Sequence, residues 1–175
     1  MVEFIAMEDK LFVEIFTDGA CIGNPGPGGF AALLKFGEHK KTVCGFNKST
    51  TNQHMELSAV VCGLLALKKP CKVKITTDSM YIVNSVNKGW LNNWQRDGSV
   101  HTRPNSDLWL PLIELLKEHE VEFVWVKGHN GHQENEYCDT IATKMASRAR
   151  QEKKFRSAVG EAVNGKFVIR YSQDI

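Results

Sequence analysis

The order of hydrophobic patterns along this 175-residue chain predicts a mixed α/β fold, a five-stranded mixed sheet with helices on its faces. The chain begins with three short segments rich in apolar and β-branched residues, separated by turn residues, which indicates an antiparallel unit. Helical and strand patterns then alternate, which is typical of helices packed on a sheet. With 42% hydrophobic residues, the chain is long enough for one buried core.

The expected antiparallel unit consists of residues 11–17, 30–36 and 41–46. A loop rich in Gly and Pro follows the first segment, and the turn-like tetrapeptide Gly37-Glu38-His39-Lys40 follows the second. A short connection favours antiparallel pairing of the two strands that it joins.

A helix is expected next, because Thr50 and Gln53 form a capping box and Pro70 ends the helical pattern after Lys69. Glu56 then lies in the second turn of that helix. The later elements are a strand over 72–77, a helix capped by Asp78 or Ser79, a short helix over 89–96, a helix over 106–119, a strand over 121–126 and a helix over 134–150.

Composition limits where the protein works. The net charge of +2 is small, so affinity for nucleic acid would have to come from a local basic patch. The five cysteines are odd in number and lack a Cys-x-x-Cys pair, which argues against disulfides and thiolate-bound zinc and favours the cytoplasm. The first ten residues are acidic where a signal peptide is basic, and no apolar run is long enough to span a membrane.

Four acidic residues are the candidate functional groups: Asp18, Glu56, Asp78 and Asp139. Asp18 and Asp78 each follow an expected strand, and no Lys or Arg is adjacent in sequence to any of the four. If the fold gathers them, repulsion and burial raise their pKa values unless divalent cations with oxygen ligands lie between them. Such a site suits metal-assisted hydrolysis of phosphodiesters. Each acid taken alone is more simply a turn, a helix cap or a solvated position.

Five sequence blocks surround these acids. They are Phe16-Thr17-Asp18-Gly19-Ala20 with the Gly/Pro loop 23–29, Thr51-Asn52-Gln53-His54-Met55-Glu56-Leu57, Thr76-Thr77-Asp78-Ser79-Met80-Tyr81, Trp125-Val126-Lys127-Gly128-His129-Asn130-Gly131-His132, and Glu134-Asn135-Glu136-Tyr137-Cys138-Asp139. In this order and spacing they closely resemble type I ribonuclease H, which cuts the RNA strand of an RNA/DNA hybrid. The resemblance covers residues 11–150 and implies the ribonuclease H-like fold, with residues 1–10 and 151–175 as extensions.

The resemblance also implies a mechanism. Asp18 would bridge two Mg²⁺ ions, with Glu56 and Asp78 on one side and Asp139 on the other, and Mn²⁺ could substitute. In the family, the histidine that matches His129 assists proton transfer and product departure. The products would carry 5′-phosphate and 3′-hydroxyl ends.

Substrate contacts are expected on both strands of the hybrid. Recognition of RNA requires contact with the 2′-hydroxyl, for which the backbone at Cys21, Gly23 and Asn24 and the side-chain amides of Asn52 and Gln53 are suited. By resemblance, the DNA strand would be held by a phosphate pocket and by a protruding handle. The pocket would use Thr51 and Asn105, and the handle would use Trp90, Trp94, Arg96 and Arg103.

Three alternatives remain open at this stage. The chain could be a ribonuclease H-like module that binds nucleic acid without cutting it, a retroelement-derived ribonuclease H domain, or an exonuclease or resolvase with the same carboxylates. Trp90 and Trp94 could be ordinary core residues, since two tryptophans at helical spacing usually are. No obligatory protein partner is expected, so the protein should act as a monomer.

Overall fold

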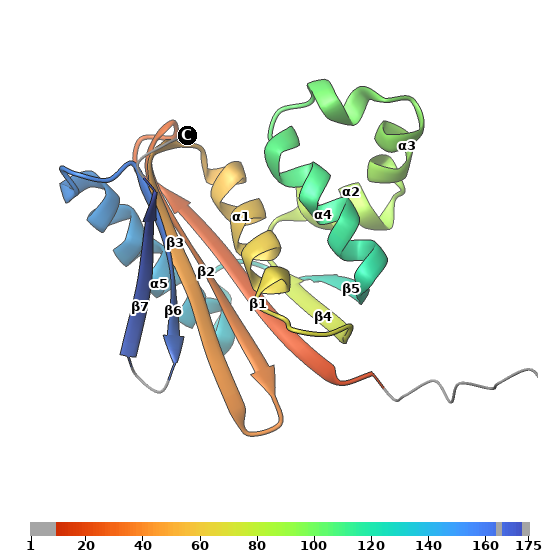
Figure 1. Ribbon diagram of the computed structural model, residues 1–175, viewed down its shortest axis with the longest axis horizontal. Helices are drawn as coiled ribbons and strands as arrows, with labels where there is room; N and C mark the ends of the chain where they lie inside the picture. Colours follow the sequence, from red (N-terminus) through yellow and green to blue (C-terminus); the bar gives the residue numbers. More distant parts are fainter. Residues whose placement is uncertain (1–9, 164–165, 173–175) are drawn as a thin grey trace, which may run out of the picture.

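A seven-stranded sheet with the strand order β5-β4-β1-β2-β3-β6-β7 forms the centre of the computed structural model (Figure 1), which describes residues 10–163 and 166–172. The strands are β1 (Phe12–Cys21), β2 (Gly26–Phe36), β3 (His39–Thr50), β4 (Lys72–Thr77), β5 (Glu120–Trp125), β6 (Ser157–Val163) and β7 (Lys166–Ser172). The helices are α1 (Asn52–Leu65), α2 (Met80–Asn87), α3 (Trp90–Arg96), α4 (Ser106–Glu118) and α5 (Gln133–Gln151), with a short 3-10 helix, η1 (Ser99–Thr102).

The mixed α/β architecture expected from the sequence is confirmed. β1, β2 and β3 pair antiparallel, whereas β4 pairs parallel with β1 and β5 pairs parallel with β4. The carboxyl ends of β1 and β4 therefore point the same way from neighbouring positions. This arrangement brings the residues that follow the two strands close together.

The expected count of five strands is wrong, because a C-terminal hairpin adds two more. β6 pairs antiparallel with β3, and β7 pairs antiparallel with β6. The sequence of β6, Ser-Ala-Val-Gly-Glu-Ala-Val, is rich in Ala and Gly, which have low strand propensity, so its pattern gave no strand prediction. Its position is set by tertiary packing: Ala158 is buried against Phe46 and Ala149. Residues 1–9 of the expected N-terminal extension lie outside the described part of the chain.

Alternating residues of β1 reach two hydrophobic layers on opposite faces of the sheet. Ile15 packs in the cluster that contains Leu57 and Leu64 of α1, whereas Phe16 packs in the cluster that contains Cys138 and Ala142 of α5. The two helices therefore cover opposite faces of β1–β3. α5 approaches β2 very closely, because a Cβ atom at Gly29 would lie 2.5 Å from Cβ of Met145.

α1 begins at Asn52 with Thr51 as its N-cap, one residue later than the expected cap at Thr50. Thr51 has extended backbone angles, and its hydroxyl accepts a hydrogen bond from the backbone N–H of His54 at 3.1 Å. The helix ends at Leu65, before the expected Lys69.

α2, α3, η1 and α4 form a helical lobe at the upper right of Figure 1. Its centre is aromatic: Trp109 is fully buried, and its ring lies edge-on to that of Trp94 with centroids 5.5 Å apart. Tyr81 contacts both rings. Within the described parts of the chain, no helix combines the length and the apolar character needed to cross a membrane.

Candidate active site

Three carboxylates meet where β1, β4 and α1 come together. Asp18 lies on β1, Asp78 directly follows β4, and Glu56 is the fifth residue of α1. Each offers a carboxylate oxygen, and these oxygens all lie within 4.8 Å of one another. Asp18 is 5% exposed, and the other two side chains are half-buried. The structure thus brings together three of the four acids chosen from the sequence.

Two glycines permit this close approach. A Cβ atom at Gly19 would lie 2.6 Å from the carbonyl carbon of Met55, so a side chain there would push α1 and Glu56 away from β1. A Cβ atom at Gly128 would lie 2.5 Å from Oδ2 of Asp78. The loop that carries His129 therefore packs directly on the Asp78 carboxylate.

Burial and mutual repulsion make these acids weaker than free carboxyl groups. Burial, followed by the charge of Asp78, raises the pKa of Asp18 to about 8, although the backbone N–H of Gly19 donates to its Oδ1 at 2.8 Å. Burial and the charge of Asp78 also raise the pKa of Glu56 to about 7. The pKa of Asp78 itself is raised, chiefly by burial.

The donor set fits a hard divalent cation. Among the described residues, no Lys or Arg forms an ion pair with Asp18, Glu56 or Asp78. Oδ1 of Asp78 is buried and accepts no hydrogen bond from another residue of the described chain. Clustered carboxylate oxygens without a counter-charge are the ligands that Mg²⁺ and Mn²⁺ prefer.

Asp139 stands slightly apart from this group. It is half-buried on α5, on the other side of the sheet from α1, and is not one of the three acids whose oxygens lie within 4.8 Å. Its charge nevertheless contributes to the raised pKa values of Asp18 and Asp78. Asp139 therefore faces the same centre.

His129 is exposed in the loop between β5 and α5. Its backbone adopts a left-handed conformation with φ of 53°, which is uncommon for a residue with a side chain. The charge of His129 lowers the pKa of Asp78, so the imidazole lies near the carboxylates. It reaches them from the solvent side.

The residues expected to contact RNA meet at the start of α1. Oδ1 of Asn24 accepts a hydrogen bond from the backbone N–H of Asn52 at 2.9 Å, and Nδ2 of Asn52 donates to Oε1 of Glu56 at 3.4 Å. The Cys21 thiol donates to the carbonyl of Thr50 at 3.4 Å, next to the N-cap residue of α1. Gly23, with φ of 76°, allows the loop to turn.

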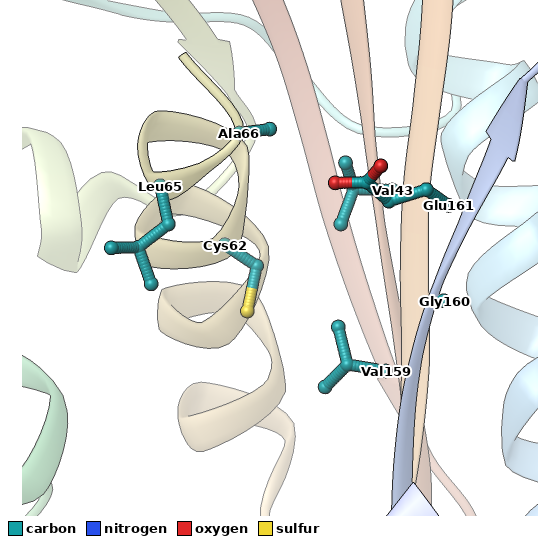
Figure 2. Close-up of a pocket in the computed structure, with 7 residues that line it drawn as sticks. All are labelled: Val43, Cys62, Leu65, Ala66, Val159, Gly160 and Glu161. Carbon is teal, nitrogen blue, oxygen red and sulfur yellow. The ribbon is translucent and has the colours of Figure 1, made fainter. Parts of the chain in front are cut away.

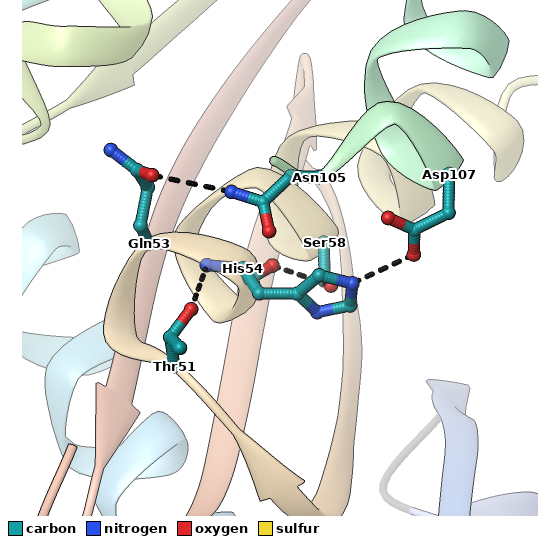
Figure 3. Close-up of polar contacts among 6 residues, drawn as sticks. All are labelled: Thr51, Gln53, His54, Ser58, Asn105 and Asp107. Carbon is teal, nitrogen blue, oxygen red and sulfur yellow. Dashed lines mark hydrogen bonds and ion pairs between the residues drawn. The ribbon is translucent and has the colours of Figure 1, made fainter. Parts of the chain in front are cut away.

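α1 and α4 are joined by polar contacts beside these residues (Figure 3). Nδ2 of Asn105 donates to Oε1 of Gln53 at 3.2 Å, and Nε2 of His54 lies within hydrogen-bond distance, 2.8 Å, of Oδ2 of Asp107. The structure thus holds Thr51 and Asn105, the expected phosphate pocket, at the same junction. The sequence analysis assigned no role to His54 or Asp107, since a contact between residues 53 positions apart leaves no local pattern.

In the expected handle, the two tryptophans differ. Trp94 is 7% exposed and belongs to the main core, whereas Trp90 is half-buried with Nζ of Lys88 at 5.9 Å from its ring centroid. The guanidinium of Arg103 stacks on the Trp94 ring at 3.8 Å, and Arg96 is exposed. Trp94 is therefore a core residue that supports Arg103, and direct contact of its ring with substrate stays a prediction.

The carboxylates do not line the cavity shown in Figure 2. This cavity of about 220 Å³ lies between the end of α1 and β6. It is lined by Val43, Cys62, Leu65, Ala66, Val159, Gly160 and Glu161. The acids instead lie on β1, directly after β4 and on the second turn of α1.

A mixed α/β fold whose described residues gather three carboxylates, with no Lys or Arg paired to them, is typical of a metal-dependent hydrolase. A model of the RNase H family matches residues 10–147. Ribonuclease H of Oleidesulfovibrio alaskensis is 54% identical over 140 residues, which cover 78% of this chain and 91% of that protein. Ribonuclease H of Novosphingobium aromaticivorans is 50% identical over 141 residues, which cover 78% and 98%.

A solved structure supports the same assignment. The crystal structure of LC9-RNase H1, a type 1 RNase H with the type 2 active-site motif, is similar with a TM-score of 0.72 and 28% identity, covering 80% of this chain and 74% of that chain. This chain therefore belongs to the ribonuclease H family, and the resemblance found in its sequence is confirmed.

Proposed function

We propose that this protein cuts the RNA strand of RNA/DNA hybrids internally, leaving 5′-phosphate and 3′-hydroxyl ends. The observation that carries the proposal is the convergence of Asp18, Glu56 and Asp78 within 4.8 Å, with no basic residue of the described chain paired to them. Family membership gives the substrate class, and this cluster gives the chemistry.

Two Mg²⁺ ions are proposed as the cofactor, with Mn²⁺ able to replace them. Asp18, Glu56, Asp78 and Asp139 would hold them. Bound there, the ions supply an activated water and stabilise the charge on the departing 3′-oxygen. The protein's own hydrogen bonds hold these ligands in place and favour their charged forms against the effect of burial: Nδ2 of Asn52 donates to Glu56, and the backbone N–H of Gly19 donates to Asp18. His129, at the exposed side of the carboxylates, moves a proton and assists product departure.

The hybrid would lie across the start of α1. Asn24, Asn52 and Gln53 offer amides to 2′-hydroxyl groups of the RNA strand, together with the backbone at Cys21 and Gly23. The DNA strand would lie toward the helical lobe, where Thr51 and Asn105 take a phosphate. Arg96 and Arg103 bind further phosphates, with Trp90 and Trp94 beneath them.

The protein is proposed to act as a monomer in the cytoplasm. All five cysteines are free thiols in the structure, as a reducing compartment requires.

A cleavage assay on end-labelled substrates tests the proposal. The hybrid should be cut to internal fragments with Mg²⁺ and should stay intact without it, whereas duplex RNA and duplex DNA of the same sequence should not be cut. Release of mononucleotides from an end would identify an exonuclease instead. Equal cutting of duplex DNA would contradict the proposed substrate.

A further inference from the structure

A basic segment, residues 148–156, joins α5 to β6 and has no part in the site described above. Its nine residues contain five basic side chains and one acidic one, so the segment carries a net charge of +4 while the whole chain carries only +2. The basic residues are Arg148, Arg150, Lys153, Lys154 and Arg156. The rest of the molecule is therefore slightly acidic, and this is a strong local concentration of positive charge.

Most of this charge faces the solvent. Arg150, Lys153 and Lys154 are exposed, and none of the three forms an ion pair with another described residue. The single acid is turned to the backbone: Glu152 accepts hydrogen bonds from the N–H groups of Lys154 at 2.8 Å and Phe155 at 3.4 Å. Uncompensated positive charges on one surface attract an anionic polymer.

The basic segment is fixed beside the start of α1. The backbone N–H of Lys48, near the end of β3, donates to the carbonyl of Arg156 at 2.9 Å, and the Lys48 ammonium group donates to the carbonyl of Glu152. Thr51 follows Lys48 by three residues, which span at most about 11 Å. The segment thus borders the residues that the proposed function places on the substrate.

Figure 1 shows the same arrangement at the scale of the molecule. The basic segment crosses the upper left, the start of α1 lies at the upper centre, and α3 and η1 lie at the upper right. If one end of a nucleic acid lies on the helical lobe and the duplex crosses the start of α1, its other end points toward the basic segment.

We infer that the basic segment binds phosphates of the nucleic acid on the side of the active site opposite the helical lobe. This inference rests on the proposed function for the orientation of the substrate. The segment begins after residue 147, where the match to the family model ends. Phosphates are the fitting ligand because the segment offers several exposed cations close together in sequence, and phosphate contacts need no base recognition.

A binding experiment tests the inference. The Asp78→Asn variant, which should not cut, is titrated onto a labelled hybrid of about 20 base pairs, roughly 70 Å of duplex, by fluorescence anisotropy. Adding Lys153→Ala and Lys154→Ala should raise Kd about two- to thirtyfold, the effect of losing two exposed charge pairs. The slope of log Kd against log salt should fall by about 2.

Lys68→Ala with Lys69→Ala is the matched control. These lysines are also adjacent and exposed, but they lie beyond the far end of α1, about 20 Å from its start. Their removal should leave Kd and the salt slope unchanged, while Lys153→Arg with Lys154→Arg should bind like the parent. Equal Kd values and slopes for the two alanine pairs would overturn the inference, even if the parent enzyme cuts hybrids. If the parent cuts nothing but the 153/154 pair still weakens binding, the basic segment is a nucleic-acid surface and the proposed function fails.

Discussion

The carboxylate centre and the surface around it are built in opposite ways. Asp18, Glu56 and Asp78 are buried or half-buried, lie within 4.8 Å of one another and have raised pKa values. The surrounding cations, such as Arg96 and Lys153, are exposed. Crowded like charges cost stability when they are not neutralised, whereas exposed single charges cost little. Substitutions of the clustered carboxylates should therefore change turnover and stability together. Substitutions of the exposed cations around them should change only the affinity for nucleic acid.

The largest effect is expected for Asp78→Asn at the centre. The amide keeps the shape of the side chain but cannot supply an anionic ligand, so Mg²⁺-dependent cleavage should fall to background. Without metal, the melting temperature should rise, because the charge of Asp78 contributes to the raised pKa values of its two neighbours. Glu118→Gln, at an exposed acid on α4, is the control and should change neither quantity. Near-normal cleavage by Asp78→Asn would contradict the metal-site assignment.

His129→Ala should slow turnover by roughly 10²–10⁴, the usual size of a general acid–base contribution. Metal affinity should stay the same, because His129 is proposed to act outside the metal ligands. Single-turnover kinetics and a metal titration measure the two effects separately. His39→Ala, at an exposed histidine at the start of β3, should leave both unchanged. Loss of metal binding together with activity would make His129 a ligand.

The dependence of unfolding free energy on pH should report how much the crowded carboxylates destabilise the folded protein. The pKa of Asp18 is about 8 in the folded protein against 3.8 in an unfolded chain, and that of Glu56 is about 7 against 4.5. Between about pH 4 and 8 the folded state thus binds more protons than the unfolded state, so stability should fall as pH rises through this window. Chemical denaturation in EDTA at several pH values measures the slope. Mg²⁺ should flatten it, and Asp18→Asn should remove most of it.

Two substitutions in the helical lobe test whether the lobe binds the DNA strand. Trp94→Ala removes a buried aromatic and should cost about 3–5 kcal/mol of unfolding free energy. Arg103→Ala removes only the group stacked on that ring, so it should raise KM for the hybrid with little change in melting temperature or in kcat at saturating hybrid. If Arg103→Ala leaves KM unchanged, the lobe does not bind the DNA strand.

Sequence alone predicted the elements whose patterns are local. The bounds expected for β4, residues 72–77, are those found, because an apolar run between Pro70 and a helix cap leaves one solution. Both Asp18 and Asp78 were expected to follow strands; Asp78 does, whereas Asp18 lies within β1, which continues to Cys21. Glu56 needed the family resemblance, since its approach to Asp18 depends on the missing side chain of Gly19.

What the sequence did not predict depends on tertiary contacts. β6 is recognisable only through its pairing with β3. Tyr81 lies 6.4 Å from the rings of both Trp90 and Trp94, and only Trp94 also packs against the buried ring of Trp109. The link between His54 and Asp107 joins two helices that no sequence pattern connects.

The C-terminal hairpin decides which strand borders the sheet. With β6 in place, residues 42–47 of β3 are paired on both sides, and their N–H and C=O groups are not open to another molecule. A chain cut after α5 would present that long strand, with Val43, Cys44 and Phe46, as a bare edge of the kind that drives self-association. β6 therefore covers this edge of β3, and versions of the protein cut after α5 should precipitate at concentrations where the full chain stays in solution.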